Sequence, residues 1–427
     1  MLDINFIREH PEEVKQALAH RHAEGAELVD RAVELDARRR ALLGEVEQLK
    51  AARNVASKEI GRIKEPAERE ARIAEQKGLG ERIAALDEGV RQVEAELHQT
   101  VSALPNLPDP RTPLGQSDDD DVLLKTVGEP RQFEFEPKAH WELGPALGII
   151  DFERGVKITG SRFYVLVGAG ARLQRALIAW MLDLHTRKQG YTEMYPPFMV
   201  NSKTMFGAGQ LPKFADNLYK DHEEDLYMVP TAEVPLTAIH ADEILEPDDL
   251  PRYYTAYTPC FRREKIAAGR DVRGIKRGHQ FDKVEMYKFC KPEDSPAEFE
   301  KMVADAEQVC AELGLTYRIN QLCTGDLGFT AQITYDIEVW APGCGEWLEV
   351  SSVSNVGDFQ ARRANVKYRP ADGSRARFVH TLNGSGLGMP RTLIAVLENY
   401  QQADGSVVVP EVLRPWMGSI DVIRSET

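Results

Sequence analysis

The chain has 427 residues, 42% of them hydrophobic, which is enough for two or three domains with buried cores. Its formal net charge of −15 excludes a general binder of polyanions, so any nucleic-acid contact must come from a local basic surface. Five scattered cysteines without a C-x-x-C pair argue against a disulfide framework and a cysteine-rich zinc site. No signal peptide and no long apolar run occurs, so we expect a soluble, cytoplasmic protein without membrane contact.

The first hundred residues carry helical repeats. Residues 1–25 are predicted to form a short helix, and apolar residues then recur in steps of three and four over residues 28–63. The pattern restarts over residues 79–97 after a break at Pro66, a residue that favours a turn or a new helix start. Two such runs predict an antiparallel coiled coil with arms of about 35 residues, or roughly 50 Å.

The predicted tip of this hairpin is locally basic. Between Lys50 and Lys77 there are eight lysines and arginines against five glutamates, on a chain that is otherwise strongly acidic. This excess suits contacts with phosphates, although periodicity alone favours a rod that binds other proteins. The candidate nucleic-acid contacts are Arg53, Lys58, Arg62, Lys64, Arg69 and Arg72.

A proline-rich and then acidic stretch over residues 104–121 is typical of an exposed linker. We therefore expect a helical domain over residues 1–104, a linker over 105–130 and a mixed α/β domain over 131–427. Within the last domain, apolar residues at helical spacing predict a helix over residues 172–188, followed by a turn and a strand.

Residues 254–289 predict two strands joined by a long basic loop. Side chains on a strand repeat every two residues, so Phe281 and Glu285 share a face of the second strand. Arg262 offers a planar fork that can hold a phosphate and a carboxylate together. Glu264 can accept the amino group of adenine and Phe281 can stack on the base. The alternative is a surface hairpin with solvated charges.

Further strands are predicted over residues 335–340 and 349–355. Glu349 and Ser352 carry hard oxygen ligands of the kind that Mg²⁺ takes beside phosphates, the alternative being a strand with an exposed acid. Glycine-rich residues 381–388 are predicted as a loop that opens a helix, without the βαβ context of a dinucleotide site.

Several motifs resemble those of seryl-tRNA synthetases, a family of class II aminoacyl-tRNA synthetases. Residues 259–264 (PCFRRE), 269–274 (GRDVRG) and 279–285 (HQFDKVE) resemble its second signature motif. The helix and strand over residues 172–197 resemble motif 1, which builds the dimer interface in that family. Residues 381–393 resemble motif 3, with Pro390 in place of the usual glycine before the arginine. Ile333 is a second departure, since many relatives carry lysine there.

The resemblance implies an α+β protein: an N-terminal antiparallel coiled-coil hairpin, and a class II catalytic domain on a mainly antiparallel sheet flanked by helices. It implies a homodimer that uses ATP and Mg²⁺ to activate L-serine as seryl-adenylate. Serine then passes to the 3' end of tRNA(Ser), and of tRNA(Sec) where an organism has it. The hairpin would hold the tRNA. A catalytically inactive relative and a coiled-coil scaffold are the alternatives.

The resemblance also implies roles for individual residues. The catalytic residues are Arg262 and Arg391, the second of which binds the γ-phosphate in the family. The serine-binding residues are Thr231, Ala232, Glu233, Arg262, Glu285, Thr381, Asn383 and Ser385, with Thr231 and Glu233 expected in a loop. The ATP-binding residues are Arg262, Arg263, Glu264, Gly278, Phe281, Glu349, Val350, Ser351, Ser352 and Arg391. Mg²⁺ is expected on Glu349 and Ser352.

Selectivity for serine requires polar groups placed for its hydroxyl, because alanine and glycine then leave them unpaired. Glu285 with Thr381 or Ser385 can supply these groups. Threonyl enzymes use a cysteine–histidine zinc site for the related task, and the sequence has no convincing equivalent, so we expect no zinc.

Overall fold

The computed structural model describes residues 1–265 and 273–425, which form two compact units, Met1–Pro105 and Asn106–Thr427. Residues 269–272 of the second signature motif lie outside the described residues. Across the described part of the chain, we find no helix that is long and apolar enough to cross a membrane.

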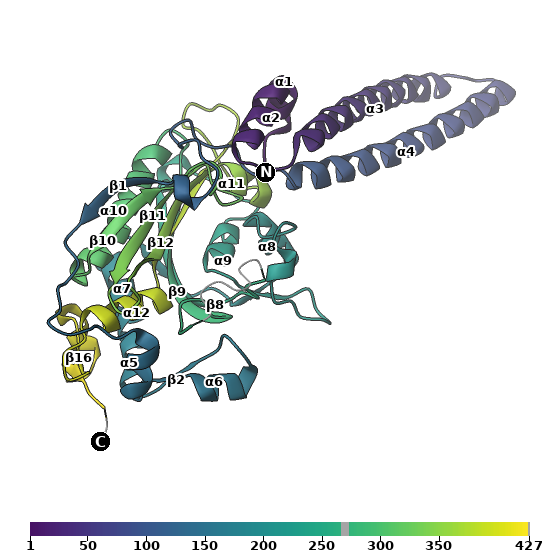
Figure 1. The fold of residues 1–427 in the computed structure, drawn as a ribbon. Coiled ribbons are helices and arrows are strands. Elements are labelled where there is room, and N and C mark those ends of the chain that lie inside the picture. Colours follow the sequence, from purple (N-terminus) through teal and green to yellow (C-terminus); the bar gives the residue numbers. More distant parts are fainter. Residues whose placement is uncertain (266–272, 426–427) are drawn as a thin grey trace. The chain divides into compact units, whose positions relative to one another are not determined.

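The first unit is entirely helical (Figure 1). Its N-terminal segment, expected as one helix, forms two, α1 (Ile4–Glu9) and α2 (Pro11–His20), because proline has no N–H to continue α1 and suits the first turn of α2. The long helices α3 (Ala26–Ile60) and α4 (Pro66–Ser102) then form a hairpin.

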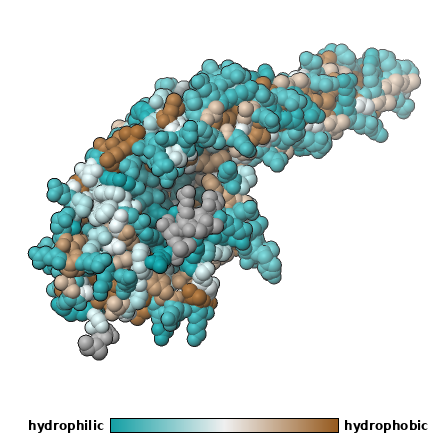
Figure 2. Space-filling view, in the orientation of Figure 1, coloured by the Kyte–Doolittle hydropathy of each residue, from teal (hydrophilic) through white to brown (hydrophobic). Residues whose placement is uncertain are grey.

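Ion pairs across the hairpin show that α3 and α4 run antiparallel, as predicted. Arg31 of α3 pairs with Glu96 of α4, and Lys50 lies 3.0 Å from Asp87 nearer the turn. Apolar burial is confined to the part of the hairpin away from the turn, whereas two large apolar side chains near the turn, Val55 and Ile73, are 58% and 50% exposed. The visible face of the hairpin is largely hydrophilic (Figure 2). The buried apolar side chains of α3 and α4 are Val29, Ala32, Leu35, Val46, Ile83, Val90, Val93, Leu97 and Val101.

The second unit is built on an eight-stranded sheet in which every neighbouring pair is antiparallel except β4 and β8. In spatial order its strands are β1 (Val122–Val127), β10 (Tyr317–Gln321), β11 (Ile333–Ala341), β12 (Glu346–Gly357), β15 (His380–Gly388), β9 (Gln280–Cys290), β8 (Arg252–Phe261) and β4 (Thr192–Met194). The predicted α+β class and mainly antiparallel sheet are confirmed.

One face of this sheet carries the main core of the unit. The helices α7 (Ala169–Lys188), α10 (Ser295–Glu312) and α12 (Met389–Asn399) pack against it (Figure 1). Val284 and Met286 of β9 belong to this core, so the side chains that alternate with them project from the opposite face. That opposite face of β9 bears the charged residues of the signature motif.

Shorter elements complete the second unit. The remaining helices are α5 (His140–Ala146), α6 (Phe152–Thr159), α8 (Ser202–Gly207), α9 (Glu233–Ala238) and α11 (Phe359–Ala364), with 3-10 turns at Asp118–Asp120, Ala215–Asn217, Pro247–Asp249 and Glu411–Trp416. The remaining strands are β2 (Ile150–Asp151), β3 (Val165–Leu166), β5 (Met199–Val200), β6 (Tyr227–Met228), β7 (Ile244–Leu245), β13 (Lys367–Tyr368), β14 (Arg377–Phe378), β16 (Val407–Val408) and β17 (Val422–Ile423).

The expected linker and the expected glycine loop also differ from the sequence prediction. The expected linker over residues 105–130 contains β1, an edge strand whose side chains are all exposed and therefore give no alternating pattern. The expected glycine loop over residues 381–388 is part of β15. Its glycines serve close packing rather than a turn: a Cβ on Gly386 would lie 2.1 Å from Nε2 of His185, and one on Gly384 3.0 Å from Val353.

Candidate active site

A cavity of about 330 Å³ opens on the face of the sheet opposite to α7, α10 and α12. Its walls come from the β8–β9 hairpin, from β12 and β15, and from the first residues of α9 and α12. The lining residues are Glu233, Arg262, Glu264, Lys276, Arg277, Gly278, Phe281, Lys283, Glu349, Val350, Ser352, Asn383, Ser385, Gly388, Pro390 and Arg391.

Arg262 directly follows β8 and lies at the cavity wall. The hairpin pairs Cys260 with Phe281, which places the Phe281 ring beside the arginine; its guanidinium carbon is 5.1 Å from the ring centroid. Its Nε donates to the carbonyl oxygen of Pro230 over 3.2 Å. These contacts fix the guanidinium plane and leave its outer edge able to hold an anion.

Glu264 and Arg277 face each other from the two sides of the hairpin. Glu264 has a positive φ of 49°, so the chain turns sharply after Arg262 and brings the Glu264 carboxylate into the cavity wall. Nη1 of Arg277 lies 3.4 Å from that carboxylate. Arg263, expected to bind ATP, is exposed and outside the cavity lining, since successive side chains of an extended chain point in opposite directions.

Glu285 is fully buried directly beneath the cavity. Its Oε2 accepts a hydrogen bond from Oγ1 of Thr231 over 3.0 Å and also pairs with Lys283, which lines the cavity. Within the described parts of the chain, Oε1 of Glu285 has no hydrogen-bond partner. A buried carboxylate oxygen without a donor is costly, so this oxygen suits a polar group of a small ligand.

Glu233 was predicted to lie in a loop but is the first residue of α9. Its backbone N–H donates a hydrogen bond to Oγ1 of Thr231. The Thr231 hydroxyl therefore accepts a hydrogen bond from the start of α9 while it donates one to Glu285. Oε1 of Glu233 accepts from Nε2 of Gln360 over 2.6 Å. Burial, and secondarily the charge of Glu285, raises the pKa of Glu233 to about 7.

Thr381 is buried away from the cavity lining. Its Oγ1 donates to Oε1 of Gln360 over 2.9 Å, and the hydroxyl of Tyr287 donates to the same oxygen. These two donors orient the Gln360 amide so that its NH₂ group faces Glu233. Thr381 therefore lies one residue removed from the expected serine pocket, whereas Asn383 and Ser385 on the same strand line the cavity.

Glu349 and Ser352 line the same cavity because β12 contains a bulge. Residues three apart on a regular strand point to opposite faces. Here Glu338 of β11 pairs with Glu349 of β12, and the preceding residue, Ile337, pairs with Ser351. Val350 is therefore an extra residue of β12. Ser351 instead donates its hydroxyl to the carbonyl of Ser385 over 2.6 Å and is buried, outside the lining.

Arg391 lies in the first turn of α12, directly after Pro390, which suits this position of a helix. Its Nη1 donates to Oε2 of Glu349 over 2.9 Å and to the Glu349 carbonyl oxygen over 2.8 Å. Burial alone would raise the pKa of Glu349, but the charges of Arg391, Arg262 and Arg277 lower it below its ordinary value. Conversely, burial and the neighbouring Glu349 raise the pKa of Asp336, which pairs with Ser352 across the sheet.

The structure thus brings most expected site residues to one cavity. Thr231, Ala232 and Glu285 are buried outside its lining, and Arg263, Ser351 and Thr381 do not line it either. Sequence reasoning assigned no role at the site to Lys276, Arg277, Lys283 or Gly388. The alternation of β9 already placed Lys283 on the face of Phe281 and Glu285, whereas the loop residues carried no local signal.

Comparison with known proteins identifies the family. Residues 1–108 match the model of the seryl-tRNA synthetase N-terminal domain, and residues 214–400 match that of the tRNA synthetase class II core domain (G, H, P, S and T). The serine–tRNA ligase of Roseiflexus sp. (strain RS-1) is 64% identical over 424 residues, covering 99% of this chain and 100% of the relative. That of Chloroflexus aurantiacus (strain ATCC 29366 / DSM 635 / J-10-fl) is 59% identical over 423 residues, with the same coverage.

Solved structures agree with this result. The seryl-tRNA synthetase of Pyrococcus horikoshii complexed with ATP has a TM-score of 0.93 and 38% identity, covering 100% of both chains. The cytoplasmic serine–tRNA ligase of Naegleria fowleri in complex with AMP has a TM-score of 0.87 and 32% identity, covering 100% of this chain and 99% of the other. The chain belongs to the seryl-tRNA synthetase family and is a class II aminoacyl-tRNA ligase.

Proposed function

We propose that the protein activates L-serine with ATP to seryl-adenylate and transfers serine to the 3' end of tRNA(Ser). The observation that carries the proposal is the charge arrangement of one cavity: Arg262 and Arg391 lie on its walls, with the acids Glu233 and Glu349 beside them and Glu285 beneath. Two fixed cations suit the phosphates of ATP, and the buried acids suit the ammonium and hydroxyl of serine. The ATP and AMP complexes of the two relatives support the nucleotide.

In the proposed reaction, a carboxylate oxygen of serine forms a bond to the α-phosphorus of ATP, and the bond from that phosphorus to pyrophosphate breaks. The protein lowers the barrier by positioning and charge stabilisation, without a nucleophile of its own. Arg262 bridges the two reacting groups, Phe281 stacks on adenine, and Arg391 binds the leaving pyrophosphate. The Glu264 carboxylate, which forms an ion pair with Arg277, accepts a hydrogen bond from the amino group of adenine.

Glu349 and Ser352 are the residues that would hold Mg²⁺. They offer a carboxylate and a hydroxyl on the same face, and a low pKa keeps Glu349 ionised. One carboxylate oxygen is engaged by Arg391, which leaves the other for a metal. The ion, when bound, would neutralise phosphate charge.

The amino acid specificity can be tested by ATP–pyrophosphate exchange with serine, threonine, alanine, cysteine and glycine. We expect exchange with serine to exceed that with alanine or glycine by several orders of magnitude, because those substrates leave the Glu285 carboxylate unpaired. Exchange that is equal for serine and alanine would contradict the proposed substrate.

The pKa of Glu233 predicts a pH dependence of serine binding. Because burial raises this pKa to about 7, the carboxyl takes up a proton as the pH falls below 7 and loses its attraction for the serine ammonium. We expect the KM for serine to rise up to about tenfold per pH unit below 7, while the KM for ATP changes little. In Glu233→Gln the KM for serine should be high and nearly independent of pH; an equal pH dependence in both proteins would exclude Glu233 as the cause.

We also infer that the hairpin of α3 and α4 binds tRNA(Ser), and tRNA(Sec) in an organism that has it. The predicted contacts lie around the turn between the two helices, and Lys58, Arg62, Lys64, Arg69 and Arg72 are exposed there. Their side chains can therefore reach phosphates, which position a nucleic acid without reading its sequence.

A homodimer is the oligomeric state we propose. The residues that resemble motif 1 form α7 and the edge strand β4, and beyond this strand Tyr195 is 83% exposed and Met199 43% exposed. Tyrosine and methionine are both enriched at interfaces between proteins. Light scattering of the purified protein should give twice the 47.9 kDa mass of the chain.

A further inference from the structure

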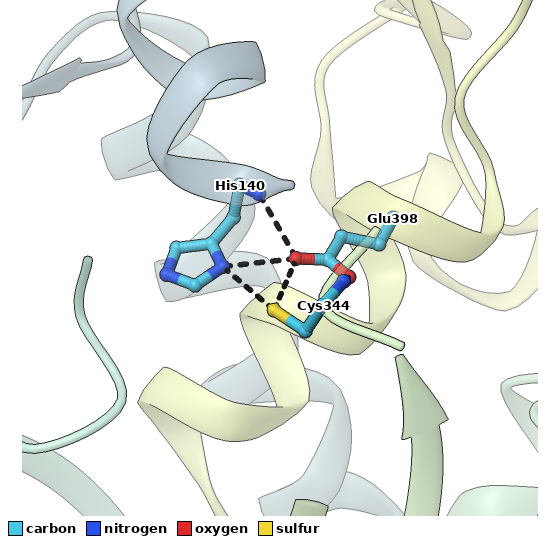
Figure 3. Close-up of side chains that lie close together, drawn as sticks. All are labelled: His140, Cys344 and Glu398. Carbon is cyan, nitrogen blue, oxygen red and sulfur yellow. Dashed lines mark hydrogen bonds and ion pairs between the residues drawn. The ribbon is translucent and has the colours of Figure 1, made fainter. Parts of the chain in front are cut away.

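A buried cluster of His140, Cys344 and Glu398 lies outside the lining of the cavity (Figure 3). His140 is the first residue of α5, Glu398 lies near the end of α12, and Cys344 lies between β11 and β12. Both His140 and Glu398 are fully buried. An imidazole and a carboxylate buried in this way need either a metal or a complete set of hydrogen bonds.

Glu398 has such a set of hydrogen bonds. Its Oε1 accepts from the backbone N–H of His140 over 2.9 Å, lies 2.9 Å from Nδ1 of the same residue, and accepts from Sγ of Cys344 over 3.0 Å. Its Oε2 accepts from the backbone N–H of Cys344 over 2.9 Å. Burial alone would raise the pKa of Glu398, but the hydrogen bonds from His140 and Cys344 lower it below its ordinary value.

The backbone determines the tautomer of His140. Nε2 of the ring accepts a hydrogen bond from the N–H of Ile275 over 3.1 Å, so Nε2 carries a lone pair. Nδ1 therefore carries the ring proton and donates a hydrogen bond to Glu398. A metal ion on Nδ1 would move the ring proton to Nε2. Two hydrogen-bond donors, Nε2–H and the N–H of Ile275, would then face each other. The cluster is therefore a hydrogen-bonded unit and not a metal site.

Ile275 lies in the segment that leads from the loop of the β8–β9 hairpin back into β9. We call this segment, residues 273–279, the returning limb. It follows Gly274, whose φ is +70° and where a Cβ would lie 1.9 Å from Nε2 of His140. It precedes Lys276 and Arg277, which line the cavity. The hydrogen bond to His140 thus fixes the backbone immediately before two of the cations to which the sequence assigned no role.

We propose that His140 is a positioning residue for ATP, an inference that rests on the proposed function. Through Nε2 it holds the returning limb of the hairpin, and through Nδ1 it is joined to Glu398, two helical turns after Arg391 on α12. The imidazole therefore keeps Arg277, which faces Glu264 at the adenine end, in register with the helix that carries Arg391 at the phosphate end. The proposed serine-binding residues, unlike Arg277 and Arg391, lie on neither the returning limb nor α12.

Two substitutions of His140 separate its two hydrogen bonds. In His140→Asn the amide nitrogen takes the place of Nδ1, so the bond to Glu398 is kept and the acceptor for Ile275 is lost. In His140→Gln an amide oxygen can reach the place of Nε2 and accept from Ile275. We expect the dissociation constant for ATP, measured by calorimetry, to rise about tenfold in His140→Asn and clearly less in His140→Gln. In pyrophosphate exchange the KM for ATP should follow, and the KM for serine should stay unchanged.

Cys344→Ser is the matched control, because it keeps a donor to Glu398 and does not touch Ile275; its ATP affinity should equal that of the wild type. Gly274→Ala should weaken ATP binding as much as His140→Asn does, because the added Cβ displaces the returning limb from the imidazole. If His140→Asn does not fold, Gly274→Ala is the deciding variant.

ATP affinity equal to that of the wild type in His140→Asn would overturn the inference. If only Gly274→Ala folds, the same result in that variant would overturn it. So would equal losses in the Asn and Gln variants, or stoichiometric zinc that Cys344→Ser removes. Absence of serine-dependent exchange in the wild type would instead contradict the proposed function, because the ATP affinities are measured without serine.

Discussion

Replacing Arg262 with alanine is expected to lower serine-dependent pyrophosphate exchange by about three orders of magnitude, because this guanidinium holds both the attacking carboxylate and the α-phosphate. The side chain is preorganised by the carbonyl of Pro230 and the ring of Phe281, so its loss removes stabilisation that water cannot replace. Arg262→Lys keeps the charge but not the planar fork, and should recover only part of the rate.

Arg424→Ala is the matched control for this prediction. Arg424 is an exposed arginine of the same unit that pairs with Asp404 at the surface, over 3.0 Å, and its loss should leave exchange unchanged. The thermal melting temperature should be similar in all variants, because Arg262 is only partly buried. Exchange at the wild-type rate in Arg262→Ala would show that another group performs its role.

Shortening the α3–α4 hairpin is expected to separate the activation of serine from its transfer to tRNA. If residues 38–93 are replaced by about four glycines, serine-dependent pyrophosphate exchange should be unchanged, whereas charging of tRNA(Ser) should fall by about a hundredfold or more. The ends of the deletion face each other, since Nη1 of Arg39 lies 4.0 Å from the carboxylate of Glu94. The buried residues Leu35 and Leu97 remain to pack the shortened unit.

A charge-reversal variant keeps the hairpin and tests the basic tip itself. Arg62→Glu, Lys64→Glu and Arg69→Glu change exposed side chains and should leave the fold unaltered. We expect weaker charging and a smaller dependence of the tRNA KM on salt concentration, because fewer counterions are released on binding. Equal charging by the full-length and shortened proteins would exclude the hairpin as a tRNA-binding element.

The sequence predicted the elements whose patterns are local. The heptads of α3 and α4 and the alternation of β8 and β9 follow from the side chains themselves, and both features are present in the structure. The chemistry of their oxygen ligands marked Glu349 and Ser352 as a possible Mg²⁺ site, but no pattern in the sequence places them on the same face. Three residues apart on a strand, they share a face solely because Val350 is an extra residue, and a bulge has no sequence signal of its own.

Other site residues depend on contacts between distant segments. Arg277 reaches the cavity because Ile275 is held by His140, which lies 135 residues earlier in the chain. Thr381 was expected at the serine pocket, yet its hydroxyl turns to Gln360, a partner that no local pattern links to it. Arg263 was expected to bind ATP alongside its neighbours, although the extended backbone directs it to solvent.

The uneven burial along α3 and α4 gives the hairpin a gradient of local stability. Side chains such as Val29 and Val93 are almost completely buried, whereas Val55 and Ile73, near the turn, expose half of their surface or more. Amide hydrogens around the turn should exchange with solvent fastest and those beside Val29 slowest. The end that carries the basic side chains can thus reshape itself around a curved RNA at little energetic cost, while its base stays rigid.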